Sequence, residues 1–219
     1  WNFAATASLN RWKVKIYYEH YFDDHSQMFF QYGRWKDGHI GLEITFPKNR
    51  FIDTFVYEGL GTKDQTGPML YDSFWGKFEE QISAKDNYYN HYLYQGWQHW
   101  GMGIGNPLLP GPIYNKNGQI TFISNRVLAH HIGFCGSPCQ SLSYRMLLSY
   151  SRHWGTYDNP LNEIKKQFNS LFEVTYAPQQ LKGWSFTVSG AMDRGSILGN
   201  NYGGMLVIRK QGIIKSGNK

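Results

Sequence analysis

Aromatic and histidine side chains that could bind carbohydrate gather in one stretch of the chain. They are Tyr88, Tyr89, His91, Trp97, His99 and Trp100. Sugar rings pack their C–H faces on aromatic rings, while Asn, Gln and His exchange hydrogen bonds with hydroxyl groups. The same rings could instead pack on one another as the small core of a compact loop. The stretch therefore predicts either a polysaccharide-binding surface or a self-packed loop.

Two arginines extend this candidate site. Arg126 opens one long predicted strand and Arg152 ends the one after it. A guanidinium group pairs with carboxylates and other acidic groups of a polymer. The formal net charge of +6 also favours an anionic partner. We therefore expect the bound polysaccharide to be acidic and place both arginines among its contacts.

Other chemistry finds little support in the residues. The glycines of Gly101–Gly105 lie in a Pro-rich loop with no strand–helix context, so they do not form a dinucleotide-binding motif. The histidines show no metal-ligand spacing such as HExxH, and no nucleophile elbow or Walker loop occurs. The acidic pairs Asp23–Asp24 and Glu79–Glu80 have no convergent partner in the pattern. We expect no enzymatic activity, no cofactor, no metal and no nucleic-acid partner.

Two cysteines stand close together between two predicted strands. Cys135 and Cys139 flank Gly136, Ser137 and Pro138, which indicates a turn. Disulfides form in oxidising compartments such as the periplasm. We predict a disulfide that closes this small loop, and two free thiols are the alternative.

The elements that carry these residues are mainly strands, because apolar residues recur at every second position. The clearest runs are Ile40 to Phe46, Leu142 to Tyr150 and Tyr202 to Ile213, with further strands at about 120–132, 170–177 and 183–192. Another run falls at 28–32. About ten strands are predicted in all, in one all-β domain that covers residues 1–219.

The alternation stops between Glu58 and Gly118, which predicts a long loop or plug inside the domain. Two short helices are also expected. One would begin at Pro160, capped by Asp158 or Asn159, and run to Phe168. The other would run from Ser73 to Ala84, where apolar residues keep helical spacing.

Two kinds of protein share this pattern: a soluble sandwich or barrel, and an outer-membrane β-barrel. Strands such as Leu142 to Tyr150 approach the length of about 9–11 residues that crosses a bilayer at a tilt. Aromatic residues gather at strand ends, as in the interfacial girdles of membrane barrels. No run of about 20 apolar residues exists to form a membrane helix. The pattern favours an antiparallel transmembrane β-barrel.

Several short motifs add a resemblance to a known family. The stretches are Asp86–His91, Tyr94–Gly101, Gly105–Leu108, Arg126–Gly133, Leu148–Tyr157, Asp193–Ser196, Leu198–Asn201 and Gly204–Lys210. In order and spacing they resemble the C-terminal half of the capsule-assembly Wzi family of Gram-negative outer-membrane proteins. The similarity runs from about Trp12 to Gly212.

The resemblance implies an eighteen-stranded outer-membrane barrel that tethers capsular polysaccharide without catalysis. About ten strands cannot close such a barrel, so we expect this chain to lack N-terminal strands. Another chain or a missing segment would complete the barrel. The expected partners are capsular polysaccharide and outer-membrane lipid. A channel that conducts small anionic solutes is the alternative function, and an open lumen would distinguish it from a blocked one.

Overall fold

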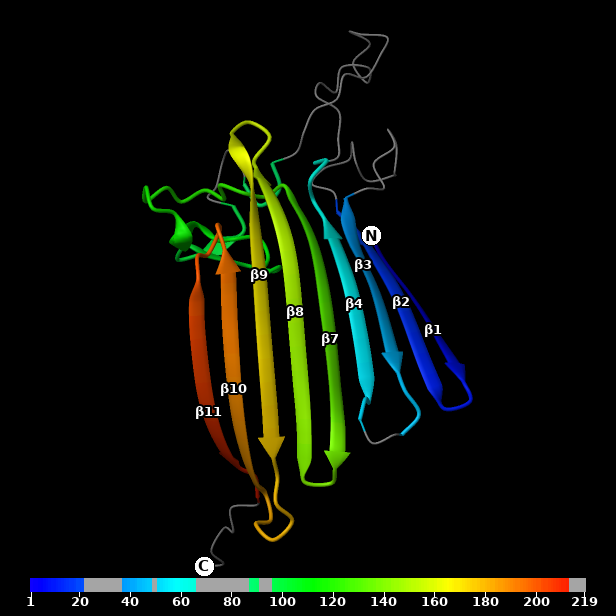
Figure 1. The fold of residues 1–219 in the computed structure, drawn as a ribbon. Helices are drawn as coiled ribbons and strands as arrows, with labels where there is room; N and C mark the ends of the chain where they lie inside the picture. The colour runs from blue at the N-terminus through cyan, green and yellow to red at the C-terminus, as the bar shows by residue number, and fades with distance from the viewer. Residues whose placement is uncertain (22–36, 49–50, 66–86, 91–95, 213–219) are drawn as a thin grey trace, which may run out of the picture.

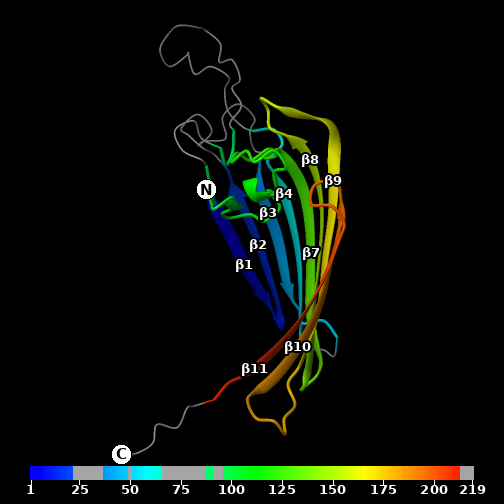
Figure 2. The ribbon, with the colours of Figure 1, turned by 90° about the vertical axis from the view of Figure 1, so that its left-hand side faces the viewer.

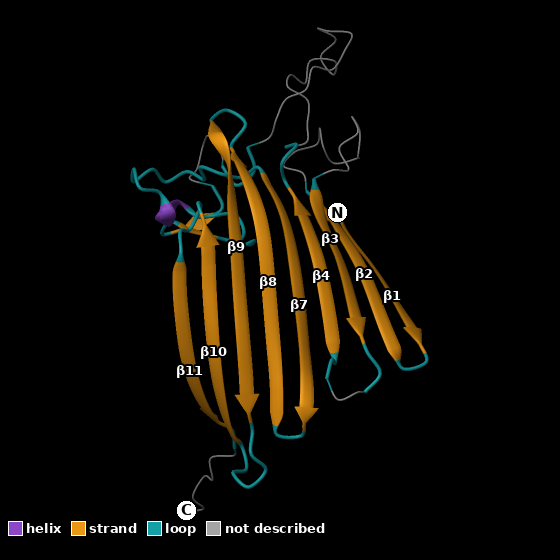
Figure 3. Ribbon diagram, in the orientation of Figure 1, coloured by secondary structure: helices purple, strands orange, loops and turns teal. Residues whose placement is uncertain are grey.

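The computed structural model describes residues 1–21, 37–48, 51–65, 87–90 and 96–212. Its main feature is a nine-stranded sheet in which every strand pairs antiparallel with the next along the chain (Figures 1 and 3). The strands are β1 (Asn2–Leu9), β2 (Trp12–His20), β3 (Gly38–Thr45), β4 (Thr54–Gly61), β7 (Val127–Cys139), β8 (Leu142–Gly155), β9 (Pro160–Tyr176), β10 (Trp184–Gly195) and β11 (Asn201–Lys210). The prediction of an all-β antiparallel chain is confirmed. Among the described residues the sheet does not close, because β1 and β11 form its two edges.

The connections differ in length at the two ends of the sheet (Figure 1). One end carries connections of two to eight residues (10–11, 46–53, 140–141 and 177–183), among them the turn Asn10–Arg11, where Asn10 takes a φ of 56° that suits asparagine. We call this the short-turn end. The other end carries the connections 21–37, 62–126, 156–159 and 196–200, and we call it the long-loop end.

Strand alternation gives the sheet two different faces. The sheet is curved, and the described residues between β4 and β7 lie on its concave side (Figure 2). The concave face carries polar residues such as Glu19, Ser149 and Asn169, which line clefts beside that segment. The convex face carries the opposite set, and its apolar side chains are exposed. Among them are Phe3, Ile16, Ile40, Phe172, Val188, Leu206 and Ile208.

The segment between β4 and β7 forms no strand of the large sheet in its described parts, which are residues 62–65, 87–90 and 96–126. We call these residues the inward segment. They contain only the two-residue strands β5 (Gln98–His99) and β6 (Met102–Gly103) and the 3-10 turn η3 (Pro112–Tyr114). The predicted unpatterned region of 58–118 covers most of this stretch, although β4 continues to Gly61. No described residue belongs to a helix long and apolar enough to cross a membrane.

The helix predicted from Pro160 to Phe168 is wrong. These residues form the first half of β9, which pairs with β8 at Pro160 and, after a register shift, from Lys165 onward. Proline is tolerated as the first residue of a strand, where its missing N–H has least effect. Pairing with a long neighbouring strand therefore outweighs the local capping signal. The predicted helix at 73–84 and the predicted strand at 28–32 lie outside the described residues.

Two further predictions are corrected at β7. The strand expected over 120–132 begins only at Val127, because residues 120–126 belong to the inward segment. The predicted turn around Gly136 is part of the same strand, and β7 turns into β8 at Gln140–Ser141. Cys135 and Cys139 are free thiols rather than a disulfide. An extended strand rises about 3.3 Å per residue, so residues four apart exceed the roughly 7 Å that a disulfide bridges.

Candidate functional site

A cleft of about 740 Å³ lies between the concave face of β2–β4 and the inward segment. We call it the concave cleft. Its strand side is formed by Tyr17, Glu19, His39, Glu58 and Leu60, and its loop side includes Tyr88, Tyr89, Trp97, Ile104 and Asn106. Three of the sequence-predicted binding residues, Tyr88, Tyr89 and Trp97, therefore meet in one cleft.

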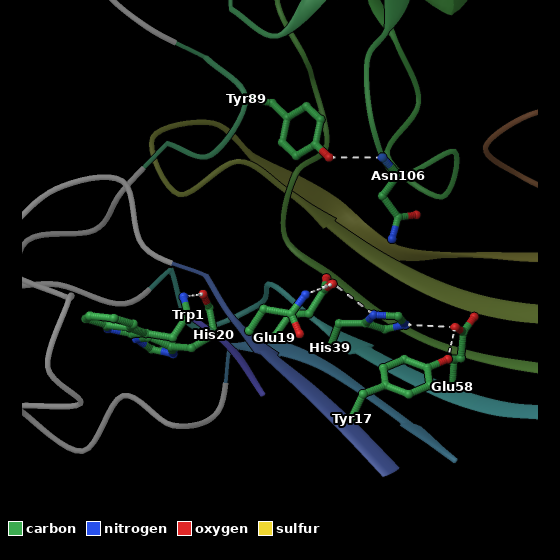
Figure 4. A network of polar contacts seen from close by, with 9 residues as sticks. Trp1, Tyr17, Glu19, His20, His39, Glu58, Tyr89 and Asn106 are labelled. Carbon is green, nitrogen blue, oxygen red and sulfur yellow. Dashed lines mark hydrogen bonds and ion pairs between the residues drawn. The ribbon is translucent and has the colours of Figure 1, made fainter. Parts of the chain in front are cut away.

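The strand side of the cleft is built by two rows of facing residues. One row joins Glu19, His39 and Leu60 across β2, β3 and β4, and the next joins Tyr17, Gly41 and Glu58. The His39 ring lies between two carboxylates, with Nδ1 3.6 Å from Glu19 and Nε2 3.6 Å from Glu58 (Figure 4). The antiparallel register thus gathers two acidic groups and an imidazole from three strands.

Gly41 has a steric role in this arrangement. A Cβ built at Gly41 would lie 1.9 Å from Cζ of Tyr17, so the Tyr17 ring crosses β3 directly over the glycine. The Tyr17 hydroxyl then donates a hydrogen bond to Glu58 on β4 (Figure 4). The absence of a side chain at Gly41 allows a residue of β2 to reach a residue of β4.

The loop side of the cleft is held by backbone conformation and hydrogen bonds. Tyr89 has a φ of 70° and Gly96 a φ of 75°, and the Trp97 N–H donates to the Tyr89 carbonyl at 2.9 Å. The Tyr89 ring packs on Phe122 with centroids 5.1 Å apart, and its hydroxyl accepts a bond from the Asn106 N–H at 3.2 Å (Figure 4). Burial raises the pKa of the Tyr89 phenol, and the bond from Asn106 partly offsets this. The phenol is neutral at physiological pH.

Asn125 anchors the inward segment near the cleft. This buried side chain donates to the Asn87 side chain at 2.7 Å and to the Tyr88 carbonyl at 2.6 Å. It accepts from Gln65 Nε2 at 2.6 Å. The Thr62 hydroxyl donates to the Asn125 carbonyl at 2.7 Å, so the start and end of the inward segment are tied together. The Asn125 amide is bonded through both its nitrogen and its oxygen, which fixes one conformation of the backbone around it.

Tyr88 is buried, and a hydrogen bond holds its side chain in place. Its hydroxyl donates to Asp37 Oδ2 at 3.1 Å, and 7% of the residue is exposed. Trp97, in contrast, is 57% exposed. Both alternatives drawn from the sequence are therefore represented: Tyr88 belongs to the packed interior of the loop, and Trp97 presents its ring to the cleft.

His99 and Trp100 lie elsewhere. They line a separate groove of about 540 Å³ on the inward segment, with Pro112 and Gln119. Their rings meet edge to face at 6.2 Å, and Trp100 is 88% exposed. The structure does not bring them to the concave cleft. His91 is outside the described residues.

Arg126 and Arg152 share the long-loop end of the sheet but not the concave cleft. Arg126 Nε donates to the Lys63 carbonyl at 3.0 Å, and its guanidinium lies 5.3 Å from the Tyr157 ring centroid. Arg152 faces the convex side, opposite Lys166, with its guanidinium 5.5 Å from the Trp154 centroid. Neither arginine lines the cleft that holds the tyrosines and Trp97.

A second cleft, of about 530 Å³, separates the inward segment from β8 and β9. It contains the buried Ser151, whose hydroxyl lies 2.8 Å from His153 Nε2. The other ring nitrogen of His153 faces the Ser124 hydroxyl at 3.4 Å. A serine nucleophile needs a histidine oriented by a carboxylate, and the described neighbours of His153 offer a second hydroxyl there instead. The pair acts as a buried hydrogen-bonded contact between β8 and the segment.

Sequence reasoning missed the strand side of the concave cleft: Tyr17, Glu19, His39 and Glu58. The signal was present, because Tyr17 and Glu19 occupy the polar positions of an alternating strand. Finding the site required the register that aligns these positions across three strands. Within the described ranges, no three His, Cys, Asp or Glu side chains converge as metal ligands.

The arrangement suits hydrogen bonding and stacking with a polyhydroxylated ligand. Carboxylates accept hydrogen bonds from hydroxyl groups, an imidazole donates or accepts, and an exposed indole offers a flat apolar face. Comparison of the chain with protein-family models, with curated proteins and with solved structures found no match.

Proposed function

We propose that this chain forms part of the wall of an outer-membrane β-barrel. The convex face supports the proposal, because it exposes apolar side chains on every strand of the large sheet except β4. From Leu142 to Tyr150 the apolar side of β8 extends about 26 Å at about 3.3 Å per residue. At a tilt of about 40° this gives a band about 20 Å tall, close to the roughly 25 Å of membrane barrels. The edges β1 and β11 would pair with further strands, since a bilayer leaves no backbone group unpaired.

Aromatic residues border the apolar band at both ends. At the short-turn end, Trp12 and Phe46 contact each other with centroids 5.0 Å apart, and Trp184 stacks on Phe186 on the distant strand β10. Tyr202 lies at the long-loop end. Aromatic girdles of this kind occupy the two membrane interfaces. Because outer-membrane barrels have short periplasmic turns and longer outer loops, the long-loop end would face the cell exterior.

The concave cleft is the binding site for polysaccharide in this proposal. The observation that carries it is the exposed Trp97 ring facing a strand surface of Glu19, His39 and Glu58 across one cleft. A sugar ring stacked on the indole would direct its hydroxyls toward carboxylate and imidazole acceptors. The cleft is lined by Glu19, His39 and Leu60, which lie at the long-loop end of β2, β3 and β4, the end that would face a capsular polymer outside the cell. This is the capsule-tethering role that the resemblance to the Wzi family implies.

The charges of the cleft refine the expected ligand. Its lining includes two carboxylates and no Lys or Arg among the described residues. A sugar with its own carboxylate would be repelled here. We therefore assign the cleft to neutral, hydroxyl-rich units of the polymer. The acidic character expected from the sequence gains no support from the cleft, since both candidate arginines lie outside it.

The position of the inward segment favours binding over transport. Its residues line clefts with both halves of the concave face, β2–β4 on one side and β8–β9 on the other. It therefore occupies the space that a channel would leave open (Figure 2). A gated channel would need this segment to leave, although Thr62 bonds it to β7: the Val127 N–H donates to the Thr62 hydroxyl at 3.0 Å, and the Thr62 N–H donates to the Val127 carbonyl at 2.8 Å.

The binding proposal is tested by a pair of tryptophan variants. Trp97→Ala should weaken binding of capsular polysaccharide extracted from the producing cells by about fivefold, because one aromatic stack contributes about 1 kcal/mol. The matched control is Trp100→Ala, which removes a more exposed indole outside the cleft and should leave binding unchanged. Equal effects of the two variants in a calorimetric titration would reject the cleft as the site.

The membrane proposal has its own test. The intact chain should require detergent or lipid to remain dispersed, and it should float with vesicles in a density gradient. A chain that is monodisperse in plain buffer would contradict a lipid-facing convex surface.

A further inference from the structure

Three cationic residues lie side by side on the convex face at the long-loop end. Arg152 on β8 is directly opposite Lys166 on β9. Arg194 on β10 is opposite Phe168, which places it diagonal to Lys166 on the same face. The strands β8, β9 and β10 lie side by side in Figure 1. We call Arg152, Lys166 and Arg194 the cationic rim.

The cationic rim has no acidic counterpart. None of its members forms an ion pair with a described carboxylate, and the convex positions of the nine strands carry no Asp or Glu. Like charges directly opposite each other in a sheet are destabilising. A repulsion between Arg152 and Lys166 that no described acidic neighbour relieves favours an anion bound beside them.

The surroundings of the cationic rim identify the kind of anion. The next convex residues toward the middle of the sheet are apolar: Tyr150 on β8, Phe168 on β9 and Met192 on β10. A ligand that contacts both regions has an anionic head and an apolar tail. Arg152 packs over the Trp154 ring, which is the type of residue found at the level of lipid headgroups.

We propose that the cationic rim binds the phosphate groups of an anionic lipid whose acyl chains lie against the convex face. The proposal rests on the membrane location argued above. Guanidinium groups bind phosphate through paired hydrogen bonds, and Lys166 adds a point charge between the two arginines. The lipid would belong to the leaflet at the long-loop end, because among the described strand positions Lys210 is the only cation on the convex face at the opposite end, and it donates to the Lys182 carbonyl.

The test uses the full chain in phosphatidylcholine vesicles that contain a few per cent of brominated phosphatidylglycerol or brominated phosphatidylcholine. Quenching of tryptophan fluorescence reports which lipid gathers at the protein. The wild type should favour the anionic lipid. Each of Arg152→Gln, Lys166→Gln and Arg194→Gln should lower that preference by about fivefold, since one cation near a membrane surface contributes about 1 kcal/mol. The triple variant should show no preference.

A control with the same charge change replaces Lys13, Lys116 and Lys182 by Gln, all exposed and away from the cationic rim. It should keep the wild-type preference. Added inorganic phosphate should not displace the lipid, and equal binding of free phosphate would overturn a lipid site. If the triple variant instead kept the lipid preference and lost binding to soluble polygalacturonate, the lipid site would be overturned. The cationic rim would then be assigned to a polyanion.

Flotation separates the two proposals. A chain that does not float with the vesicles would overturn both the membrane location and the lipid site. A chain that floats but shows no preference for phosphatidylglycerol would overturn the lipid site alone.

Discussion

Gly41→Ala should displace the Tyr17 ring from the floor of the concave cleft and destabilise the sheet. The added Cβ would lie 1.9 Å from Cζ of Tyr17. Alanine has no side-chain torsion that could relieve this clash, so the Tyr17 ring has to move. Overpacking of this kind costs about 1–3 kcal/mol, and a hydrogen bond to a charged group contributes about 1.5–3 kcal/mol. Because Tyr17 is half-buried, we take the lower ends of both ranges and expect a loss of about 2–3 kcal/mol.

A double-mutant cycle identifies the cause of that loss. In the Tyr17→Ala background the ring is gone, so Gly41→Ala should be neutral or stabilise by up to about 1 kcal/mol through the unfolded chain. Gly41 has no positive φ, so alanine causes no backbone strain. The free energy of unfolding would be measured by reversible urea titration in detergent micelles, followed by tryptophan fluorescence.

The control is Gly203→Ala on β11, which is also on the concave face. A Cβ at Gly203 would meet no atom within 4 Å, so its effect should stay within about 0.5 kcal/mol. If Gly41→Ala cost the same with and without the Tyr17 ring, the steric explanation would be refuted.

Three further predictions concern the inward segment, the arginines and the cysteines. Asn125→Ala removes hydrogen bonds to Asn87, Tyr88 and Gln65 and should lower the local stability of the inward segment by about 2–3 kcal/mol. Limited proteolysis should therefore cut residues 96–126 faster, while the strand content measured by circular dichroism stays unchanged. Unchanged cleavage would show that other contacts hold the segment. Arg126→Gln should leave the polysaccharide affinity and its salt dependence, measured by calorimetry, unaltered, because Arg126 lies outside the concave cleft. A reduced salt dependence would show that Arg126 contacts the polysaccharide. Titration with a thiol reagent should find two thiols, with the exposed Cys139 reacting before Cys135, and no reaction would indicate the disulfide.

Strand positions were the part of the fold most accessible from the sequence. The alternation from Leu142 to Tyr150 specifies an apolar and a polar face whatever the neighbours are, because side chains in a strand point to opposite sides in turn. Local signals failed where pairing decided the outcome. Pro160 with Asp158 has the pattern of a helix start, yet β8 continues to Gly155 and offers a paired edge, so the same residues extended β9.

The aromatic stretch shows the same division for the candidate site. Composition alone identified Tyr88, Tyr89, Trp97 and Trp100 as suited to carbohydrate, since ring chemistry is a property of each residue. Which of them share a cleft depended on the turn at Gly96 and on the anchoring of Asn125, contacts between residues distant in sequence.

The amino-acid sequence by itself therefore determined that this protein is an antiparallel β-structure with an apolar and a polar face. It also determined that the aromatic stretch carries side chains able to stack on sugar rings. Only the tertiary structure decided that Glu19, His39 and Glu58 face Trp97, and that Arg152 turns away to the convex side beside Lys166. The physical reason is register. A shift of one residue between strands would move every side chain to the other face, and the register is set by contacts along the whole sheet rather than by any local run of residues.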